Sequence, residues 1–434
     1  MKKQNLLAIG LMTFAMFLGA GNIIFPPFLG LEAGTQFFPA MLGFLVTAVG
    51  LPALTLIVLG RLNDSGQLTQ ALPKPLGVTF WVLLFIAIGP AFGMPRAVTV
   101  AYEMGIKPFF TGDHLMIFSA LFVGATLLLA FQRGKLVDYI GKVMTPLLVL
   151  MLAALALAAI ITPLGVLGDP SASYQNKAIT SGLIQGYMTM DAIAAVGFGW
   201  VIIKAIRDKG CESAEDVFQA TLKVTLIYAL LMSACYLAMA YVGATSTSIA
   251  EGATNGGELL TRYVAAIFGP LGQYLLAGII IMACLTTTVG LTNACAEYSQ
   301  QTFRIPFSIS AIIVTAMTGV VANFGLEQIL AISLPAILIL CPVAIALVLA
   351  AWFLPTIKRN TTSYVSIVMI SFVFGGLDAL HILGLLSESL STPLTRYVPL
   401  FSAHASWFLP VVLAVFISLL LNRQSRVVKA SAEV

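Results

Sequence analysis

The sequence predicts an all-α polytopic membrane protein with about twelve transmembrane helices, and two observations support this fold class. Hydrophobic residues make up 59% of the chain and charged residues only 9%, whereas soluble domains carry roughly 25% charged residues. Apolar runs close to the roughly 20 residues that a bilayer-spanning helix needs recur from one end of the chain to the other. The composition therefore excludes a soluble protein.

The apolar runs divide the chain into twelve predicted spans, joined by connections without a long linker or a low-complexity segment. One integral membrane domain over residues 1–434 is therefore expected. The predicted spans are 5–30, 37–60, 77–101, 114–132, 143–162, 178–203, 217–243, 270–296, 306–323, 327–353, 364–386 and 404–422.

The positive charges indicate how these spans are oriented. If the N-terminus is cytoplasmic, 17 of the 22 Lys and Arg residues lie on the inner side, and only five lie on the outer side or within a span. Inner loops of membrane proteins are enriched in Lys and Arg, so we expect both termini in the cytoplasm. The basic residues are spread along the chain, and no nucleic-acid partner is expected. The five exceptions are Arg96, Lys107, Lys177, Arg262 and Arg396.

Two predicted spans are interrupted near mid-length by small and polar residues. The first span runs into residues 18–22 (Leu-Gly-Ala-Gly-Asn) and then Pro26-Pro27, and the sixth contains residues 186–192. An unwound stretch at this depth is tolerated only where it faces protein or a cavity. Gly21 and Thr189 are 168 residues apart, about five spans, which predicts inverted repeats over 5–162 and 178–353 with two additional helices over 364–422. Close packing between neighbouring helices is the alternative reason for such residues.

An interrupted helix offers both ends of a binding site for a zwitterion. The second half begins with free N–H groups and partial positive charge, which suit a carboxylate. The first half ends in free carbonyl oxygens, which can hold an ammonium group or sodium. The small residues 19–21 would let a ligand touch backbone. A transporter of amino acids is therefore expected.

Three hydroxyls follow one another in the eighth span, at Thr286, Thr287 and Thr288. Helical spacing places Ala283 on the same face as Thr286 and Thr287, and hydroxyl and carbonyl oxygens are suitable sodium ligands. The alternative is that these hydroxyls bond to carbonyls one turn earlier, as membrane Ser and Thr commonly do.

Four charged residues near or within spans need a reason, because an ionised residue at mid-membrane costs roughly 2.5–3.5 kcal/mol. Asp191 could act as a gate, as a partner for a cation or as an acceptor for backbone at the second interruption. Arg96 and Glu103 are seven residues apart and could form a structural pair or an outer gate. Asp378 lies outside the predicted repeats and is expected to serve packing or an interface.

An enzyme is not expected. His114, His381 and His404 lie on different segments, and neither an HExxH nor a GxSxG motif is present. The five cysteines show no CxxC spacing and are interpreted as packing residues, so neither a metal centre nor a cofactor is predicted.

The chain resembles the bacterial branched-chain amino acid:cation symporters, from about residue 5 to its C-terminus. Three motifs carry this resemblance: Gly19-Ala20-Gly21-Asn22-Ile23-Ile24-Phe25-Pro26-Pro27, Gly89-Pro90-Ala91-Phe92-Gly93-Met94-Pro95-Arg96, and Thr189-Met190-Asp191. The resemblance implies the LeuT-type fold, with two inverted five-helix repeats, broken first and sixth spans and two extra helices. It also implies location in the bacterial inner membrane.

The wider superfamily pattern implies roles for individual residues. Substrate would be bound by Phe17, Ala20, Gly21, Asn22, Tyr187, Met188 and Thr189. Sodium would be bound by the carbonyls of Ala15, Leu18 and Ala283 and by the hydroxyls of Thr286 and Thr287. Asp191 stands where related transporters often carry an acidic gating residue.

The implied activity is symport of leucine, isoleucine and valine with sodium. A proton-coupled transporter of the same fold, using Asp191, is the nearer alternative, and a channel or receptor on the same scaffold is the more distant one. The expected partners are the small-molecule substrate and the lipid bilayer, without an obligatory protein partner.

Overall fold

The computed structural model describes residues 2–62, 65–132, 135–353 and 361–432, and within these ranges the chain forms helices and no strand. Each of the twelve predicted spans coincides with helix. Eight helical stretches of the described chain are long and apolar enough to cross a membrane, and three shorter apolar helices accompany them. The all-α polytopic fold class is confirmed.

The helices follow the predicted spans in order. Those of the first five spans are α1 (Lys3–Phe17), α2 (Ala20–Ala33), α3 (Phe37–Leu45), α4 (Leu51–Leu62), α5 (Lys74–Ile86), α6 (Gly93–Gly105), α7 (Leu115–Ala130) and α8 (Thr145–Ile161). Those of the next five are α9 (Ala178–Tyr187), α10 (Asp191–Asp208), α11 (Ala214–Ala244), α13 (Pro270–Phe303), α14 (Phe307–Ala322) and α15 (Leu326–Phe353). The last two are α16 (Thr361–Ile382) and α18 (Phe408–Ala432).

Two helices lie in connections where no element was predicted, α12 (Gly256–Phe268) and α17 (Glu388–Tyr397). α12 begins with a side-chain cap, in which the backbone N–H of Glu258 donates to the side chain of Asn255 over 3.0 Å. Such a cap stabilises a helix start without an apolar run. A search for membrane-length segments does not detect helices this short and polar.

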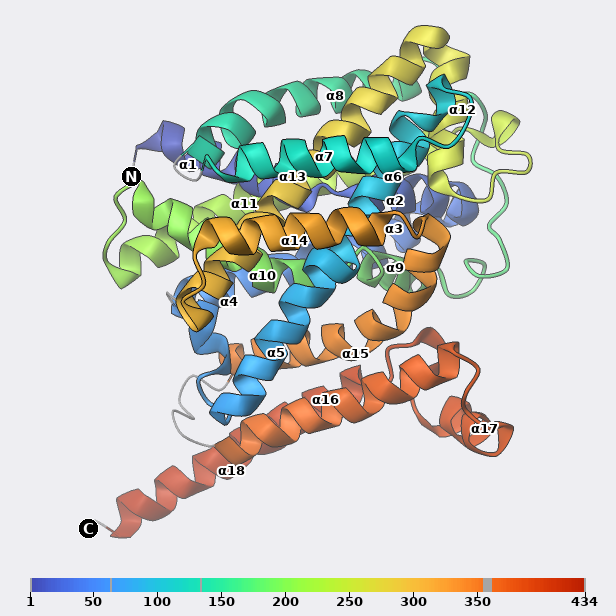
Figure 1. Cartoon of the computed structure of the whole chain (residues 1–434). Coiled ribbons are helices and arrows are strands. Elements are labelled where there is room, and N and C mark those ends of the chain that lie inside the picture. The colour runs from blue at the N-terminus through green and yellow to red at the C-terminus, as the bar shows by residue number, and fades with distance from the viewer. Residues whose placement is uncertain (1, 63–64, 133–134, 354–360, 433–434) are drawn as a thin grey trace.

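Figure 1 shows that α1 begins and α18 ends on the same side of the helical bundle, while α12 and α17 lie at the opposite side. A chain that crosses the membrane an even number of times has its two ends on the same side. α16 and α18 lie along one edge of the bundle (Figure 1). Asp378 joins them, because its carboxylate accepts a hydrogen bond of 3.0 Å from the backbone N–H of Ser406, just before α18. The division into inverted repeats stays a prediction.

The sixth span, which contains the second interruption, lies at the centre of the bundle. In the most apolar 18-residue stretch of residues 178–208, which include α9 and α10, 83% of the residues are buried. In the corresponding stretch of residues 137–161, 28% are buried. α2 packs directly on α11, where a Cβ at Gly30 would lie 1.9 Å from the Ala240 carbonyl oxygen. Only glycine permits this approach of two helix backbones. The close contact holds the first interruption in the protein interior.

Candidate functional site

The first interruption consists of only two residues, Leu18 and Gly19, between α1 and α2. The backbone N–H of Gly19 bonds to the Phe17 carbonyl over 2.7 Å, which ends α1 in a tight turn. α2 starts at Ala20 and continues through Pro26 and Pro27. The prediction that the two prolines belong to the break was therefore wrong. Because the first N–H groups of a helix have no partner within it, Ala20 and Gly21 stand where free amides are expected.

The second interruption separates α9 from α10 and also has non-helical backbone. Met190 has a φ of 71°, which places a non-glycine residue in the left-handed region. The Thr189 hydroxyl donates to the Gly186 carbonyl over 2.8 Å, which helps to end α9. Asp191 is the first residue of α10 and is 4% exposed.

Hydrogen bonds among three buried side chains join the two interruptions. The Asn22 amide donates to Asp191 Oδ2 over 2.6 Å and also to the hydroxyl of Tyr236, on α11. The Tyr236 hydroxyl donates to the same Asp191 oxygen over 2.6 Å. Asp191 therefore accepts hydrogen bonds from two side chains and ties the interrupted helices together, whereas the acceptor role expected from the sequence was for backbone.

A third interruption lies in the third span, where the sequence predicted an unbroken helix. A π-helical turn over Ala87–Ala91 contains Gly89 at φ −88° and ψ −119°, followed by Phe92 outside helical geometry. α6 restarts at Gly93 and carries Arg96 on its first turn. Since Pro90 has no backbone N–H to continue the helix, the Gly89-Pro90 pair was a signal for this break.

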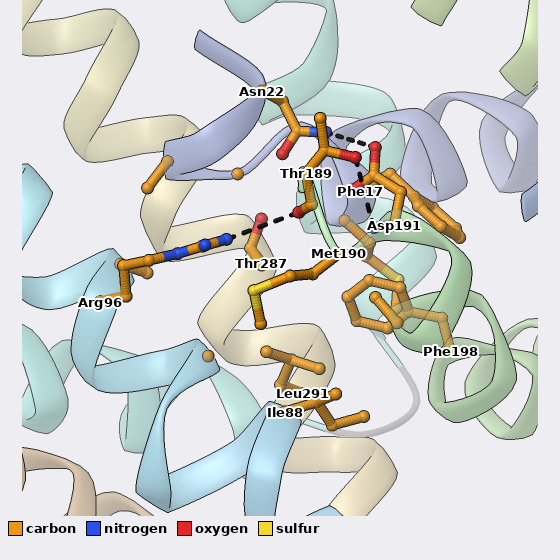
Figure 2. A pocket seen from close by; sticks show the side chains of 16 residues that line it. Phe17, Asn22, Ile88, Arg96, Thr189, Met190, Asp191, Phe198, Thr287 and Leu291 are labelled. Atoms are coloured by element: carbon orange, nitrogen blue, oxygen red, sulfur yellow. Dashed lines mark hydrogen bonds between the residues drawn. The ribbon is translucent and has the colours of Figure 1, made fainter. Parts of the chain in front are cut away.

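The interruptions surround a cavity of about 40 Å³, shown with its lining side chains in Figure 2. Its lining residues come from α1, α2, α6, α10, α13, the π-helical turn Ala87–Ala91 and the first and second interruptions. They are Met16, Phe17, Gly19, Ala20, Asn22, Ile88, Gly93, Arg96, Ala97, Thr189, Met190, Asp191, Ala194, Phe198, Thr287 and Leu291. This volume is far below the roughly 300 Å³ at which ordinary ligand pockets begin, so a ligand larger than water requires the walls to move.

The cavity has a polar end and an apolar end (Figure 2). Asn22, Thr189 and Asp191 gather at one end, and Arg96 points toward them from α6. Ile88 and Leu291 lie together at the other end, with Phe198 beside them. This separation suits a ligand with a charged head and an aliphatic tail.

The hydroxyl run of α13 meets the end of α1 beside the cavity. Thr286 Oγ1 lies 2.8 Å from the Ala15 carbonyl oxygen and 2.9 Å from the Ala283 carbonyl oxygen. Thr287 Oγ1 is buried and finds no hydrogen-bond partner within the described ranges, and it lies 3.2 Å from where a Cβ on Gly19 would stand. Oxygen atoms from two helices therefore converge at the first interruption.

Comparison with known proteins identifies the family. A profile described as "Branched-chain amino acid transport protein" matches residues 2–425. The chain belongs to this family of branched-chain amino acid transport proteins. A branched-chain amino acid transport system 2 carrier protein of Pseudomonas aeruginosa is 40% identical to it over 430 residues, covering 98% of this chain and 97% of that protein.

Solved structures show the fold of this branched-chain family member. A point mutant of a manganese transporter of Eremococcus coleocola matches with a TM-score of 0.61 at 14% identity, covering 95% of each chain. MhsT in complex with L-phenylalanine matches with a TM-score of 0.58 at 17% identity, covering 95% of this chain and 98% of that one. The chain thus shares the LeuT-type fold of these structures. Its role as a transporter rather than an enzyme follows from its family.

The structure brings most of the predicted site residues of this transporter together. Phe17, Ala20, Asn22 and Thr189 line the cavity. Ala15, Leu18, Ala283 and Thr286 are fully buried at the junction of α1 and α13. Gly21 lies just behind the wall, because a Cβ there would stand 3.2 Å from Arg96 Nη2.

Three predicted placements differ from the structure. The Tyr187 side chain faces away from the cavity and packs with its ring centroid 6.3 Å from that of Trp407. Met188 is also absent from the cavity wall, since the chain turns there into the second interruption. Glu103 pairs with Lys107 at 2.6 Å, one helical turn away, and not with Arg96, which is about 10 Å distant along the helix axis.

Sequence reasoning missed several residues of the site. Ile88, Phe198 and Leu291 are apolar residues in apolar helices, so their residue type carries no signal. Tyr236 likewise looks like an ordinary aromatic residue of α11. Only the folded arrangement shows that its hydroxyl reaches Asp191.

Proposed function

We propose that the protein imports leucine, isoleucine and valine together with sodium, by alternating access. The arrangement of Thr286 supports sodium coupling more directly than any other feature. Its hydroxyl contacts the Ala15 carbonyl of α1 as well as the Ala283 carbonyl of its own helix. A hydrogen bond to a carbonyl one turn back is the alternative for a membrane threonine. It accounts for the contact with Ala283 but not for the contact with Ala15.

Sodium at this junction would link ion binding to the substrate cavity. The Ala15 carbonyl belongs to the last turn of α1, two residues before Phe17, which lines the cavity. The buried hydroxyl of Thr287, which has no hydrogen-bond partner in the described part of the chain, is a further oxygen on the cavity side. An ion bound by these oxygens would fix α1 against α13 and thereby shape the cavity.

The two ends of the cavity match the two parts of a branched-chain amino acid. The aliphatic side chain would occupy the end formed by Ile88, Phe198 and Leu291, and the charged groups would lie at the interruptions. A single methylene changes binding in an apolar pocket by only about 1–3 kcal/mol. Transport of all three branched-chain amino acids is therefore expected.

A second cavity supports entry from the side that the charge distribution places outside. An open cavity of about 960 Å³ is lined by Ile24, Val100 and Glu103, among others. Ile24 is two residues after Asn22, which lines the substrate cavity. Opening the wall between these two cavities would admit substrate, with the protein in the inner membrane and both termini cytoplasmic.

The ion gradient can supply the work of accumulation. One sodium ion entering down a potential of 100 mV releases about 2.3 kcal/mol. At roughly 1.4 kcal/mol per tenfold change, this potential alone supports an accumulation of about fiftyfold. A sodium concentration gradient adds to it.

Uptake of labelled leucine into proteoliposomes with an imposed sodium or proton gradient tests this proposal. We expect the sodium gradient to drive uptake, and valine and isoleucine to compete. Thr286→Ala should reduce sodium-driven uptake at least tenfold and raise the sodium concentration for half-maximal uptake. Thr292→Ala is the matched control, since Thr292 is buried in the same helix and bonds only one turn back and to Met94.

Two results would contradict the proposal in different ways. Uptake driven by a proton gradient without sodium, and unaffected by Thr286→Ala, would favour proton coupling through Asp191. Failure of valine and isoleucine to compete with leucine would contradict the branched-chain substrate class.

A further inference from the structure

We propose that Arg96 binds the α-carboxylate of the transported amino acid, through the edge of its guanidinium formed by Nε and Nη2. This inference rests on the proposed function and adds to it the residue that recognises the charged end of the substrate. Three features of Arg96 support it: its poor hydrogen bonding, the absence of a direct ion pair among the described residues, and its position beside α2.

The first observation is the poor hydrogen bonding of this guanidinium. Arg96 Nη2 lies 3.5 Å from the Thr189 carbonyl oxygen, at the outer limit of a hydrogen bond. Arg96 Nε is buried and has no hydrogen-bond partner among the described residues. Buried polar groups are normally satisfied, so two neighbouring donors aimed at one side indicate an acceptor that binds there.

The chemistry of that edge indicates which acceptor it takes. Nε and Nη2 point in parallel, and their spacing matches the two oxygens of a carboxylate. Figure 2 shows the guanidinium directed from α6 toward the Thr189 carbonyl, with the Thr287 hydroxyl nearby. A carboxylate placed between the guanidinium and the interruptions would replace the long contact with Thr189 by two charge-assisted hydrogen bonds.

The second observation is the charge balance. Among the described residues, no carboxylate forms an ion pair with Arg96. Asp191 lines the same cavity, but its Oδ2 already accepts hydrogen bonds from Asn22 and Tyr236. A cation inside a membrane protein is costly unless it is paired. Asp191 acts on Arg96 electrostatically from across the cavity but does not contact it as an ion pair. The substrate carboxylate would provide a negative charge in direct contact with the guanidinium.

The third observation is the position of the guanidinium at the start of α2. A Cβ at Gly21 would stand 3.2 Å from Arg96 Nη2, so the absence of a side chain there gives the guanidinium its space. The first turn of α2 also presents free amides and partial positive charge. A carboxylate at this point would be held from two sides, by Arg96 and by backbone N–H groups.

The experiment is a binding measurement on purified full-length protein with labelled leucine, competed by leucine and by leucinamide, in which a neutral amide replaces the carboxylate. For the wild type we expect leucine to compete at least 100-fold better than leucinamide. Arg96→Gln should weaken leucine about 100-fold and leave leucinamide within about threefold, so that the preference nearly disappears. If labelled leucine no longer binds to the Arg96→Gln protein, the affinities of this variant for leucine and leucinamide are measured by direct calorimetric titration.

Arg61→Gln is the control. Arg61 lies in the last turn of α4 with its guanidinium 5.9 Å from the centre of the Trp352 ring, and it lines neither the substrate cavity nor the open cavity. It should keep the wild-type preference. If Arg96→Gln does not fold, Arg96→Lys retains the positive charge without the planar edge, and we expect its leucine affinity to fall about tenfold with a reduced preference.

Two outcomes would overturn the inference. Equal losses for leucine and leucinamide in the Arg96 variants would show that Arg96 shapes the cavity without contacting the carboxylate. Unchanged affinities for both leucine and leucinamide would show that Arg96 takes no part in substrate recognition. A wild-type protein that does not bind leucine at all would instead overturn the proposed function on which the inference rests.

Discussion

The first and second interruptions lie side by side but are built from different chemistry. The first consists of Leu18 and Gly19 and leads into the small residues Ala20 and Gly21 at the start of α2, and its backbone avoids the left-handed region, with Gly19 at φ −99°. The second passes through Met190 at φ 71° and is followed by Asp191, which receives hydrogen bonds from two other helices.

The two interruptions therefore have different roles. The glycines of the first leave space for a neighbouring group to approach the backbone, as Arg96 does at Gly21. The polar side chains of the second hold its geometry against the cost of a left-handed residue, about 1–2 kcal/mol. Substitutions should therefore damage binding at the first and stability at the second.

The largest expected effect is that of Asp191→Ala. Removal of the carboxylate leaves the Tyr236 hydroxyl buried without its acceptor, while the Asn22 amide keeps only its hydrogen bond to that hydroxyl. A buried group without its partner costs about 1–3 kcal/mol. We expect a fall of several degrees in the thermal midpoint in detergent and a loss of leucine uptake of at least 100-fold.

Asp191→Asn is the matched variant for that comparison, because its amide oxygen can accept both hydrogen bonds. It should keep most of the thermal stability. The comparison then distinguishes the effect of the hydrogen bonds to residue 191 from the effect of its negative charge. A thermal midpoint of Asp191→Ala equal to that of the wild type would show that the second interruption does not depend on this hydrogen bonding.

Gly21→Leu should abolish uptake and leave folding nearly intact. Its Cβ would stand 3.2 Å from both Arg96 Nη2 and the Phe25 ring, so the side chain must displace the guanidinium. Gly124→Leu is the control, since no atom lies within 4 Å of a Cβ at that position. The measurements are uptake and the elution profile after extraction from the membrane. Normal uptake in Gly21→Leu would remove the first interruption from the binding site.

The smallest effect is expected for Met190→Gly. Glycine relieves the left-handed strain, but it also removes a buried side chain of 6% exposure, and burial of a methionine contributes about 1.5–3 kcal/mol. Because the two contributions oppose each other, we expect a change in the free energy of unfolding of about 1 kcal/mol or less. A loss as large as that of Asp191→Ala would mean that the methionine side chain, and not the carboxylate, holds the second interruption.

Hydrophobicity made the fold predictable, because a chain in lipid must form apolar helices of nearly fixed length. The same reasoning found the interruptions at Gly19 and Thr189, where glycine and polar residues stand out against an apolar background. The family resemblance, and not hydrophobicity, placed Thr286 near α1. These signals are local, and each is visible within a few residues of sequence.

The remaining parts of the site depend on side-chain direction, which an apolar sequence does not specify. Tyr187 was expected in the cavity because it lies next to the interruption, yet its ring packs with Trp407. Arg96 was placed at an outer end because a helix was assumed to run straight through Gly89. The non-helical backbone at Gly89 precedes α6, and on α6 the Arg96 side chain reaches the centre of the protein.

The small size of the cavity has a consequence for measured affinities. A volume of about 40 Å³ cannot hold leucine, so binding must draw on a wider form that is only partly populated. The apparent dissociation constant is then the intrinsic constant divided by the fraction of molecules in that form. An ion that favoured the wider form at the α1–α13 junction would tighten leucine binding without touching leucine, and leucine would tighten ion binding by the same factor.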